Sequence, residues 1–385
     1  MLMKTNHKLW ATASALAVLA ATGTTAAMAA EPSPTARKAQ AGPSEEAQLQ
    51  KLYRDAVAEG GKLVVYAGGD KPGQADYLKT AFAKKYPKID IDVVVDFSKN
   101  HDARVDNQID EHKVVADVVQ LQTLDNFPRW KKAGALQRYK PVGWNKIYPQ
   151  IKDKDGYYTG LLFYSFGNVT ATRLGDNAPV EAKDFLKPEF RNKLVFTYPN
   201  DDDAVLYYFK QLTDTYGWGY LKKLLDQNPR FVRGTAAAAD LVGTDGLVAN
   251  FGASRSFSGL SDWTIPAKSP WLAWPQTGAI LKAAPHKAAA KLYMSWLLSK
   301  DAQQNAIGTW SAREDVAAPA GRKGIFDYKN MNPLGLGKFM NDRAALDRYK
   351  ARINLYVGDV KGANPADPTG ALGLYPVDQD GTQAP

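Results

Sequence analysis

The chain has 385 residues, of which 45% are hydrophobic and 23% charged, which is typical of a globular protein and not of a disordered one. Its formal net charge is +9, but the basic residues are dispersed along the chain rather than gathered in blocks, so we expect no nucleic-acid partner. It contains no cysteine, which excludes disulfides and thiol catalysis. The length allows about two or three domains.

The N-terminus has the pattern of a secretory signal. Lys4 and Lys8 precede an apolar stretch, and residues 27–29 (Ala-Met-Ala) offer small side chains for cleavage. The apolar stretch is shorter than the roughly 20 residues of a membrane-spanning helix. No cysteine follows it to accept a lipid. We therefore expect a signal peptide over residues 1–30, a flexible leader over residues 31–45, and a soluble protein exported to the periplasm.

The next part of the chain alternates between helical and extended patterns. Gly60-Gly61 ends the first helix, and runs of Val and Ile indicate buried strands. Such alternation predicts βαβ units and a largely parallel sheet. In chain order we expect a helix over 46–59, a strand over 62–66, a helix over 74–86, and strands over 89–97 and 116–121.

A turn at 153–156 (Asp-Lys-Asp-Gly) leads into a long extended stretch over 157–171. A second α/β series follows. We expect strands over 194–198, 231–232, 246–249 and 272–281, and helices over 204–216, 218–226 and 287–300. The last of these helices carries one apolar stripe at helical spacing. The tail over 361–385 is rich in Gly, Pro and Asp, and we expect it to be a loose extension.

Several segments together resemble a known family. Residues 272–304 combine a strand containing Pro-Gln-Thr-Gly, an Ala-Pro-His break and an amphipathic helix. This sequence pattern is similar to that of the extracellular solute-binding proteins of ABC importers, in the branch that contains the ferric-iron-binding proteins. Further matches occur in order over about 46–316, namely Gly-Lys-Leu-Val-Val-Tyr at 61–66, Ala-Phe-Ala-Lys-Lys-Tyr-Pro at 81–87, Ala-Asp-Val-Val at 116–119 and Arg-Glu-Asp-Val-Ala-Ala-Pro at 313–319.

The resemblance implies an α/β protein with the two-lobed type II periplasmic binding protein fold. Each lobe would be an open, mostly parallel sheet flanked by helices, and strands at 158–170 and 272–281 would cross between the lobes. The first lobe would comprise 46–163 plus 277–330, and the second 164–276, followed by a C-terminal helix and a loose tail over 331–385. The ligand would bind between the lobes, where loops follow the carboxyl ends of strands.

Candidate ligand contacts follow from this placement. They lie after the strands of the first lobe, including the segment 98–104, on the first crossing strand, and near strand ends of the second lobe. The residues are Gly69, Asp70, Ser98, His101, Arg104, Gln120, Gln122, Thr123, Tyr164, Ser165, Tyr198, Asn200, Asp201, Asp202, Asp203, Asn250 and Phe251. We expect no catalytic residue and no cofactor, and the sequence leaves open whether a metal is bound.

Two departures from the resemblance concern iron. Ferric-binding relatives carry a Tyr-Tyr pair where this chain has Phe251-Gly252, and a His where it has Asp70. Phenylalanine has no oxygen to offer a metal. The pair Tyr207-Tyr208 lies in a predicted helix, where adjacent side chains point about 100° apart. Dityrosyl iron binding is therefore not expected, and ferric iron bound without that pair is kept as an alternative.

A further departure is Asp201-Asp202-Asp203 at the start of a predicted helix. Relatives that bind phosphorylated or sulfonated ligands place Ser, Thr and Gly at this position, so that free N–H groups meet the anion. Three carboxylates would instead repel an anion. They either stabilise the helix start or contact the ligand. We expect a cationic, amine-bearing or polyhydroxylated small molecule.

Enzyme motifs are missing from the sequence. It contains no Gly-x-Ser-x-Gly, phosphate loop, dinucleotide fingerprint or His-Glu-x-x-His. A secreted carbohydrate-active hydrolase with paired carboxylates stays as an alternative, because many acidic pairs could serve. The favoured prediction is a monomeric, non-enzymatic binding protein. It would capture its solute by hinge closure and deliver it to an ABC permease in the inner membrane.

Overall fold

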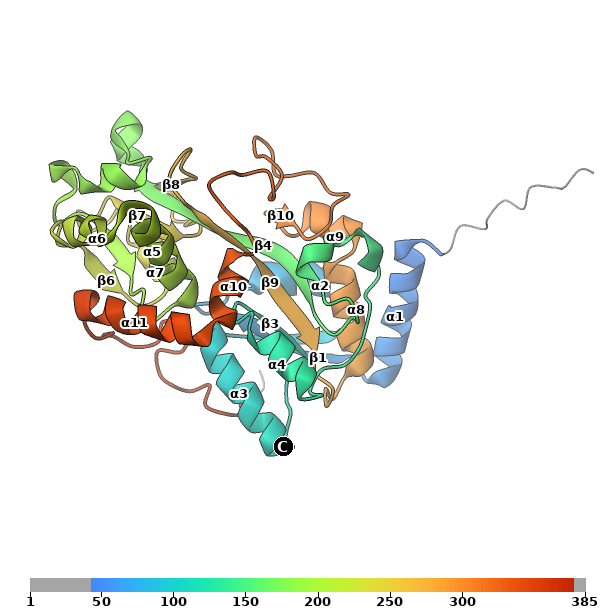
Figure 1. The fold of residues 1–385 in the computed structure, drawn as a ribbon. Coiled ribbons are helices and arrows are strands. Elements are labelled where there is room, and N and C mark those ends of the chain that lie inside the picture. Colours follow the sequence, from blue (N-terminus) through green and yellow to red (C-terminus); the bar gives the residue numbers. More distant parts are fainter. Residues whose placement is uncertain (1–42, 377–385) are drawn as a thin grey trace, which may run out of the picture. The chain divides into compact units, whose positions relative to one another are not determined.

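A computed structural model of the chain describes residues 43–376. Its main element is an eight-stranded sheet in which six strands follow the order β10-β4-β9-β3-β1-β2 (Figure 1). Strand β1 pairs in parallel with β2 and β3, and β9 pairs antiparallel with β3 and β4. The strands are β1 (Lys62–Gly68), β2 (Asp90–Asp96), β3 (Val118–Leu121), β4 (Thr159–Ala171), β9 (Leu272–Ile280) and β10 (Trp310–Ser311).

The part of the molecule built on this six-strand path is called lobe A. Its helices are α1 (Glu45–Glu59), α2 (Asp76–Lys85), α3 (Ser98–Asp110), α4 (Asn126–Lys132), α8 (Lys287–Leu297) and α9 (Lys300–Asn305), with short 3₁₀ turns at Trp144–Lys146 and Pro149–Ile151. The apolar stripe of α8 is buried, as expected from its spacing. Tyr293 and Trp296 of this stripe pack edge-on against Phe82 of α2, so α8 contributes to the lobe A core.

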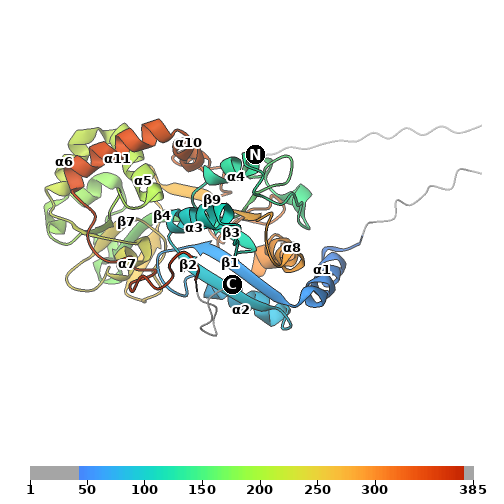
Figure 2. The ribbon, with the colours of Figure 1, turned by 90° about the horizontal axis from the view of Figure 1, so that it is seen from below.

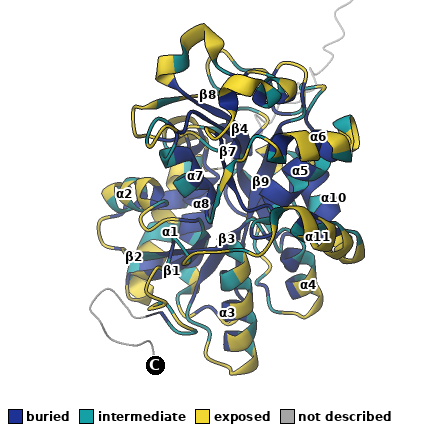
Figure 3. Ribbon diagram, turned by 90° about the vertical axis from the view of Figure 1, so that its left-hand side faces the viewer, coloured by how far each residue is buried: buried dark blue, intermediate teal, exposed yellow. Residues whose placement is uncertain are grey.

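The remaining strands form lobe B. It contains β5 (Val195–Thr197), β6 (Arg230–Val232), β7 (Ala249–Ala253), β8 (Ser261–Thr264), α5 (Asp203–Tyr216), α6 (Trp218–Leu225) and α7 (Thr235–Asp240), with 3₁₀ turns at Thr172–Asn177, Ala182–Leu186 and Pro188–Phe190. An aromatic core holds the lobe together. Phe251 contacts Phe196 and Tyr208 at ring-centroid distances of 4.4 and 5.4 Å. Figure 3 shows the buried residues along the strands and the exposed ones on the outer helices.

Strand β4 connects the two lobes. Its first part, up to Phe166, pairs with β9, and its last part pairs with β7 and β8 of lobe B. The register shifts at Gly167, where a Cβ atom would come within 2.3 Å of the carbonyl oxygen of Thr264. Only glycine allows that approach, so the change of pairing partner depends on this residue.

The C-terminal region consists of α10 (Gly335–Asn341), α11 (Arg343–Val357) and the segment 358–376. Helix α11 packs on lobe B, where the Arg352 guanidinium lies 3.7 Å from the ring centre of Trp218. Residues 361–376, expected to be loose, instead contact α3 of lobe A. Arg104 Nε donates to the carbonyl of Gly373 and Gln108 Nε2 to that of Leu374, each at 2.8 Å.

Two predicted elements differ from the structure for local reasons. The strand expected at 246–249 is wrong, because Gly243 and Gly246 adopt positive φ and form a turn, so that β7 begins only at Ala249. The helix expected over 287–300 is divided in two. Ser299 caps the second part, with its Oγ accepting a hydrogen bond from the Ala302 amide at 3.3 Å.

No helix within residues 43–376 is long and apolar enough to cross a bilayer. The signal peptide and residues 31–42 of the leader lie outside the described residues, and those two expectations stay predictions. The helix predicted from residue 46 begins at Glu45. The division of the chain into two lobes at residues 163/164 and 276/277 likewise stays a prediction.

Candidate functional site

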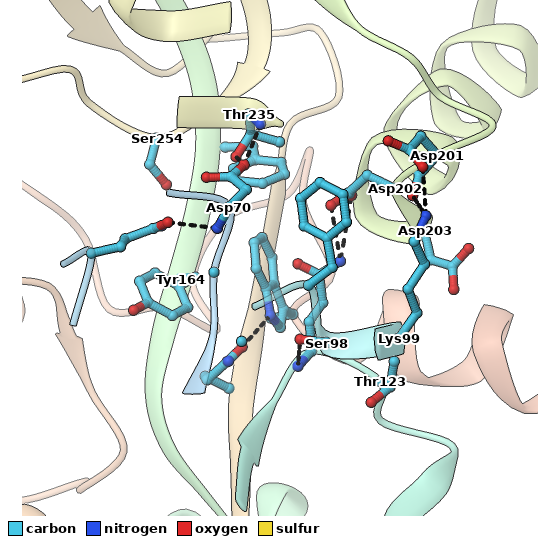
Figure 4. Close-up of a pocket in the computed structure, with 18 residues that line it drawn as sticks. Asp70, Ser98, Lys99, Thr123, Tyr164, Asp201, Asp202, Asp203, Thr235 and Ser254 are labelled. Atoms are coloured by element: carbon cyan, nitrogen blue, oxygen red, sulfur yellow. Dashed lines mark hydrogen bonds and ion pairs between the residues drawn. The ribbon is translucent and has the colours of Figure 1, made fainter. Parts of the chain in front are cut away.

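A cleft lies between lobe A and lobe B, and it encloses about 650 Å³ of space, part of it open to solvent (Figure 4). Because β1, β2 and β3 are parallel, their carboxyl ends meet at one edge of the sheet, and the segments that follow them line the cleft. The lining residues are Gly68, Gly69, Asp70, Gln74, Phe97, Ser98, Lys99, Gln122, Thr123, Tyr164, Phe166, Asp201, Asp202, Asp203, Thr235, Ser254, Trp274 and Gln276.

The lobe B wall of the cleft is acidic. Asp202 caps α5, with its Oδ1 accepting a hydrogen bond from the Val205 amide at 2.8 Å. Gln122 of lobe A reaches the same oxygen at 3.4 Å. Burial, helped by the neighbouring carboxylates of Asp203 and Asp70, raises the pKa of Asp202 from 3.8 to about 6, although the Val205 amide and the charge of Lys99 act in the opposite direction. Ionising the buried Asp202 carboxyl costs free energy, and a positive charge placed beside it would reduce that free energy.

The lysine that lines the cleft is already paired. Lys99 Nζ lies 2.5 Å from Asp201 Oδ1, and Arg233 Nε lies 2.7 Å from Asp201 Oδ2. Burial tends to raise the pKa of Asp201, but the hydrogen bonds from Arg233 and Lys99 outweigh it and leave the pKa below its usual value. Lys99 and Arg233 share the one carboxylate of Asp201, which leaves a single net positive charge in this group. The three other lining carboxylates, Asp70, Asp202 and Asp203, outnumber it and keep the cleft acidic.

Asp70 joins the two lobes. It follows β1 of lobe A and accepts hydrogen bonds from Thr235 of lobe B, from the amide N and from Oγ1, the latter at 2.7 Å (Figure 4). It also accepts a hydrogen bond from Ala236 N at 3.1 Å. Burial raises the pKa of its carboxyl. The first N–H groups of α7 are therefore occupied by a carboxylate of the protein itself, and the lobes are in contact across the cleft.

The strands that line the cleft contribute aromatic and hydroxyl groups. The Trp274 ring lies 4.8 Å from Phe166 in an edge-on arrangement and 5.8 Å from Tyr164. Its Nε1 donates to Gln276 Oε1 at 3.1 Å, which fixes the indole. The Thr123 hydroxyl is buried and has no hydrogen-bond partner within residues 43–376. This arrangement suits binding, because it offers carboxylates, an aromatic surface and a free hydroxyl.

Residues 115–324 match the family model of the bacterial extracellular solute-binding proteins, which is more than half of the chain. The chain belongs to this family. A comparison of this solute-binding protein with curated protein sequences gives no significant match.

Solved structures show the same fold. The substrate-binding protein of an ABC transporter from Agrobacterium tumefaciens has a TM-score of 0.65 at 16% identity, covering 76% of this chain and 93% of that one. AfuA from Actinobacillus pleuropneumoniae, solved with fructose-6-phosphate, has a TM-score of 0.60 at 17% identity, covering 77% and 99%. Iron-bound HitA from Pseudomonas aeruginosa has a TM-score of 0.58 at 15% identity, covering 76% and 99%. The predicted type II periplasmic binding protein fold is confirmed.

The cleft of this solute-binding protein brings together many of the predicted contacts. They come from both lobes and from β4, and they are Gly69, Asp70, Ser98, Gln122, Thr123, Tyr164, Asp201, Asp202 and Asp203. Lys99 also lines the cleft and lies in the predicted segment 98–104. Whether these residues bind ligand stays a prediction.

Other predicted contacts do not line the cleft. In lobe A, His101 and Arg104 are buried with Asp96, and Gln120 accepts a hydrogen bond from the Tyr293 hydroxyl at 2.8 Å. These side chains point into the lobe because α3 and β3 turn only part of their residues toward the cleft. Ser165 is buried on the opposite side of β4 from Tyr164, as strand alternation requires.

The predicted contacts of lobe B that do not line the cleft pack against other parts of the protein instead. Tyr198 stacks on Phe231, and Asn200 Nδ2 donates to Asn354 Oδ1 at 2.5 Å. Asn250 and Phe251 are buried in the interior of β7 and do not end a strand, since β7 begins later than predicted. The pair Tyr207-Tyr208 does not line the cleft either. Tyr208 packs against Phe251, and Tyr207 stacks on Phe339 of α10.

Sequence reasoning missed part of the lining, namely Gly68, Gln74, Phe97, Phe166, Thr235, Ser254, Trp274 and Gln276. A signal was available for some of them. Residues two apart on a strand share a face, so the predicted contact Tyr164 implies Phe166. No local pattern points to Thr235 or Ser254, because they reach the cleft only through the packing of lobe B.

Asp202 gives the protein a specific pH dependence. In the folded state its pKa is about 6, above the ordinary 3.8, so the folded protein binds this proton more tightly than the unfolded chain does. The Asp202 contribution to stability therefore falls as pH rises from about 4 to about 6. Asp202→Asn, which keeps the cap, should melt at a higher temperature than the wild type at pH 7.5.

That difference in melting temperature should shrink toward pH 4, where the wild-type carboxyl is protonated. Thermal melts of both proteins between pH 4 and 8 measure it. A difference that stays constant over this range would contradict a raised pKa at Asp202.

Proposed function

We propose that this protein is the periplasmic substrate-binding component of an ABC importer, and that its ligand is a cationic, amine-bearing or polyhydroxylated small molecule. The observation that supports this proposal is the acidic cleft. Asp202 and Asp203 face it without a cationic partner among its lining residues, because Lys99 is paired with Asp201. An ammonium group placed between the lobes would lower the cost of keeping Asp202 charged and would give Asp203 a counter-charge.

The other side of the cleft fits the same ligand class. A cation or an apolar sugar face can lie against the aromatic group of Trp274, Phe166 and Tyr164. The free Thr123 hydroxyl and the Ser98 and Ser254 side chains provide hydrogen bonds for hydroxyl or amine groups. Such a mixture of aromatic surface and a few polar groups is the usual make-up of a small-molecule site.

The lining residues are less suited to binding an anionic ligand or iron. The relatives AfuA and HitA were solved with a sugar phosphate and with iron, respectively. Here the amides of Thr235 and Ala236 are occupied by Asp70. Tyr164 is the single phenol among the lining residues, and within residues 43–376 no three His, Asp or Glu side chains are grouped so as to hold a metal ion. We therefore propose neither phosphate nor iron as the ligand.

In the proposed cycle the ligand enters between the lobes, contacts both, and stabilises the closed arrangement. Hinge closure of this kind shifts a population that exists before binding. The closed protein would then dock on an inner-membrane permease. No covalent step is involved.

A ligand screen tests the proposal. We expect amines, quaternary ammonium compounds or polyols to raise the melting temperature by several degrees, as saturating ligand does at about 100 times its Kd. Phosphonates, sugar phosphates and ferric salts serve as comparison sets and should leave it unchanged. Stabilisation by the comparison sets alone would overturn the ligand class.

A further inference from the structure

The C-terminal region of the protein extends beyond the part that matches the family. The family match ends at residue 324, and the described chain continues to residue 376. After β10 of lobe A it forms α10 and α11, and the segment 358–376 then returns to α3 of lobe A (Figures 1 and 2). The region therefore connects the two lobes by a second route besides the strands that line the cleft.

The start of the segment 358–376 is fastened to lobe B. Helix α11, which precedes it, packs on Trp218 through Tyr349, with the rings 5.5 Å apart. The carbonyl of Gly358 accepts a hydrogen bond from Asn200 Nδ2 at 2.9 Å. Arg233 Nη1 donates to the carbonyl of Gly362 at 3.3 Å. These contacts hold the segment on lobe B up to residue 362.

The rest of the segment is fastened to lobe A by buried polar groups. Asn364 Nδ2 donates to Asp96 Oδ1 at 2.8 Å, and Asp96 also pairs with Arg104 at 2.9 Å. As described above, Arg104 and Gln108 donate to main-chain carbonyls near the end of the segment. Asp96, Arg104 and Gln108 are 1%, 6% and 0% exposed. Buried groups of this kind are costly to leave without partners, so the lobe A attachment is firm.

The middle of the segment lies beside the contacts that close the cleft. Gly234 of lobe B lies close to both Pro365 of the segment and Asp70 of lobe A. If Gly234 carried a Cβ atom, that atom would lie 2.7 Å from Pro365 Cγ and 3.4 Å from Asp70 Cβ. Asp70 bonds the next residue, Thr235, across the cleft. Arg233, which holds the carbonyl of Gly362, also holds Asp201, the partner of Lys99. The segment therefore lies next to two of the contacts between the lobes, Asp70–Thr235 and Lys99–Asp201.

We propose that residues 358–376 form a strap that tethers lobe B to lobe A, limits how far the cleft opens and biases the ligand-free protein toward the closed arrangement. The hydrogen bonds of the strap go to lobe B up to residue 362 and to lobe A from residue 364, so opening the cleft must break contacts at one end. The strap acts whatever the ligand is, so it can be tested independently of the proposed function.

The absence of cysteine from the sequence makes the test direct. Lys84→Cys on α2 of lobe A and Lys223→Cys on α6 of lobe B introduce two exposed sites for spin labels. Distances between the labels are measured without added ligand in the full chain. They are then measured in a chain that ends at Gly358, in Asn364→Ala, and in Lys361→Ala. Lys361 is an exposed residue of the strap and provides the matched control.

We expect the full chain and Lys361→Ala to show mainly the short distance, with an open fraction of about 0.1–10%. Asn364→Ala should raise the open fraction on the order of fivefold, as the loss of one hydrogen bond would. The shortened chain should be mostly open. Identical distance distributions in all four proteins would overturn the strap. A shortened chain that fails to fold, together with an unchanged distribution in Asn364→Ala, would also overturn it, because the segment would then belong to the core.

Discussion

Replacing Asp202 and Asp203 together by asparagine is expected to weaken the binding of an amine-bearing ligand by about 100-fold or more. Both carboxylates line the cleft, and the lysine beside them is paired with Asp201. An ammonium group in the cleft would therefore lose its counter-charges. Asparagine caps a helix as well as aspartate does, so α5 should be retained. Isothermal titration with an amine found in the screen measures the loss.

Asp214→Asn is the matched control for this experiment. Asp214 lies at the other end of α5, is exposed, and pairs with Lys210 at 2.7 Å, so it changes the net charge of the same helix without touching the cleft. Its effect on affinity should be less than about fivefold. A polyol should lose less affinity in the double variant than an amine does, since only hydrogen bonds are changed. Equal affinity of the wild type and the double variant for the amine would contradict a cationic ligand.

Replacing Asp70 by alanine is expected to open the cleft of the ligand-free protein. The carboxylate accepts hydrogen bonds from Thr235 and Ala236 across the cleft. Without it these donors are unpaired in the closed arrangement but reach water in the open one. Leaving a buried donor unpaired costs about 1–3 kcal/mol, so the open fraction should rise by about tenfold or more. The label pair at positions 84 and 223 reports this change, and ligand affinity should fall with the closed fraction.

Lys71→Ala is the control for Asp70. Lys71 also crosses the cleft, pairing with Asp240 at 2.9 Å, but the two side chains are 50% and 39% exposed. An exposed pair contributes little, so this variant should leave the open fraction nearly unchanged. If Lys71→Ala opened the cleft as far as Asp70→Ala, the buried contact would have no special role in closure.

The agreement between sequence and structure is greatest where a local pattern determines the element. The helix expected over 287–300 was predicted from apolar spacing, because a stripe at helical period must be buried against a core, and α8 (287–297) buries that stripe. The strand after Gly60-Gly61 was predicted from glycines that end a helix and from the β-branched run that follows. Predictions failed where glycines with positive φ replaced a strand by a turn, as they do before β7.

The candidate site was predictable to the extent that it follows strand ends. Asp70, Ser98 and Gln122 line the cleft because parallel strands deliver their carboxyl ends to one edge. His101 and Arg104 come from the same segment but face inward, since a helix turns most of its residues away from any one neighbour. Thr235 and Ser254 were missed because lobe B positions them through contacts distant in sequence.

The sequence by itself indicated the family, through the resemblance of several segments to solute-binding proteins, and the α/β order of elements, which follows from periodicity. Its residues Asp201-Asp202-Asp203 also predicted acidic ligand contacts. Only the tertiary structure decided what each carboxylate does. Asp201 pairs with Lys99 and Arg233, Asp202 caps α5, and Asp70 binds the opposite lobe. It also showed that the tail returns to α3. The physical reason is that charge pairing and strap contacts join residues far apart in the chain, which no local pattern encodes.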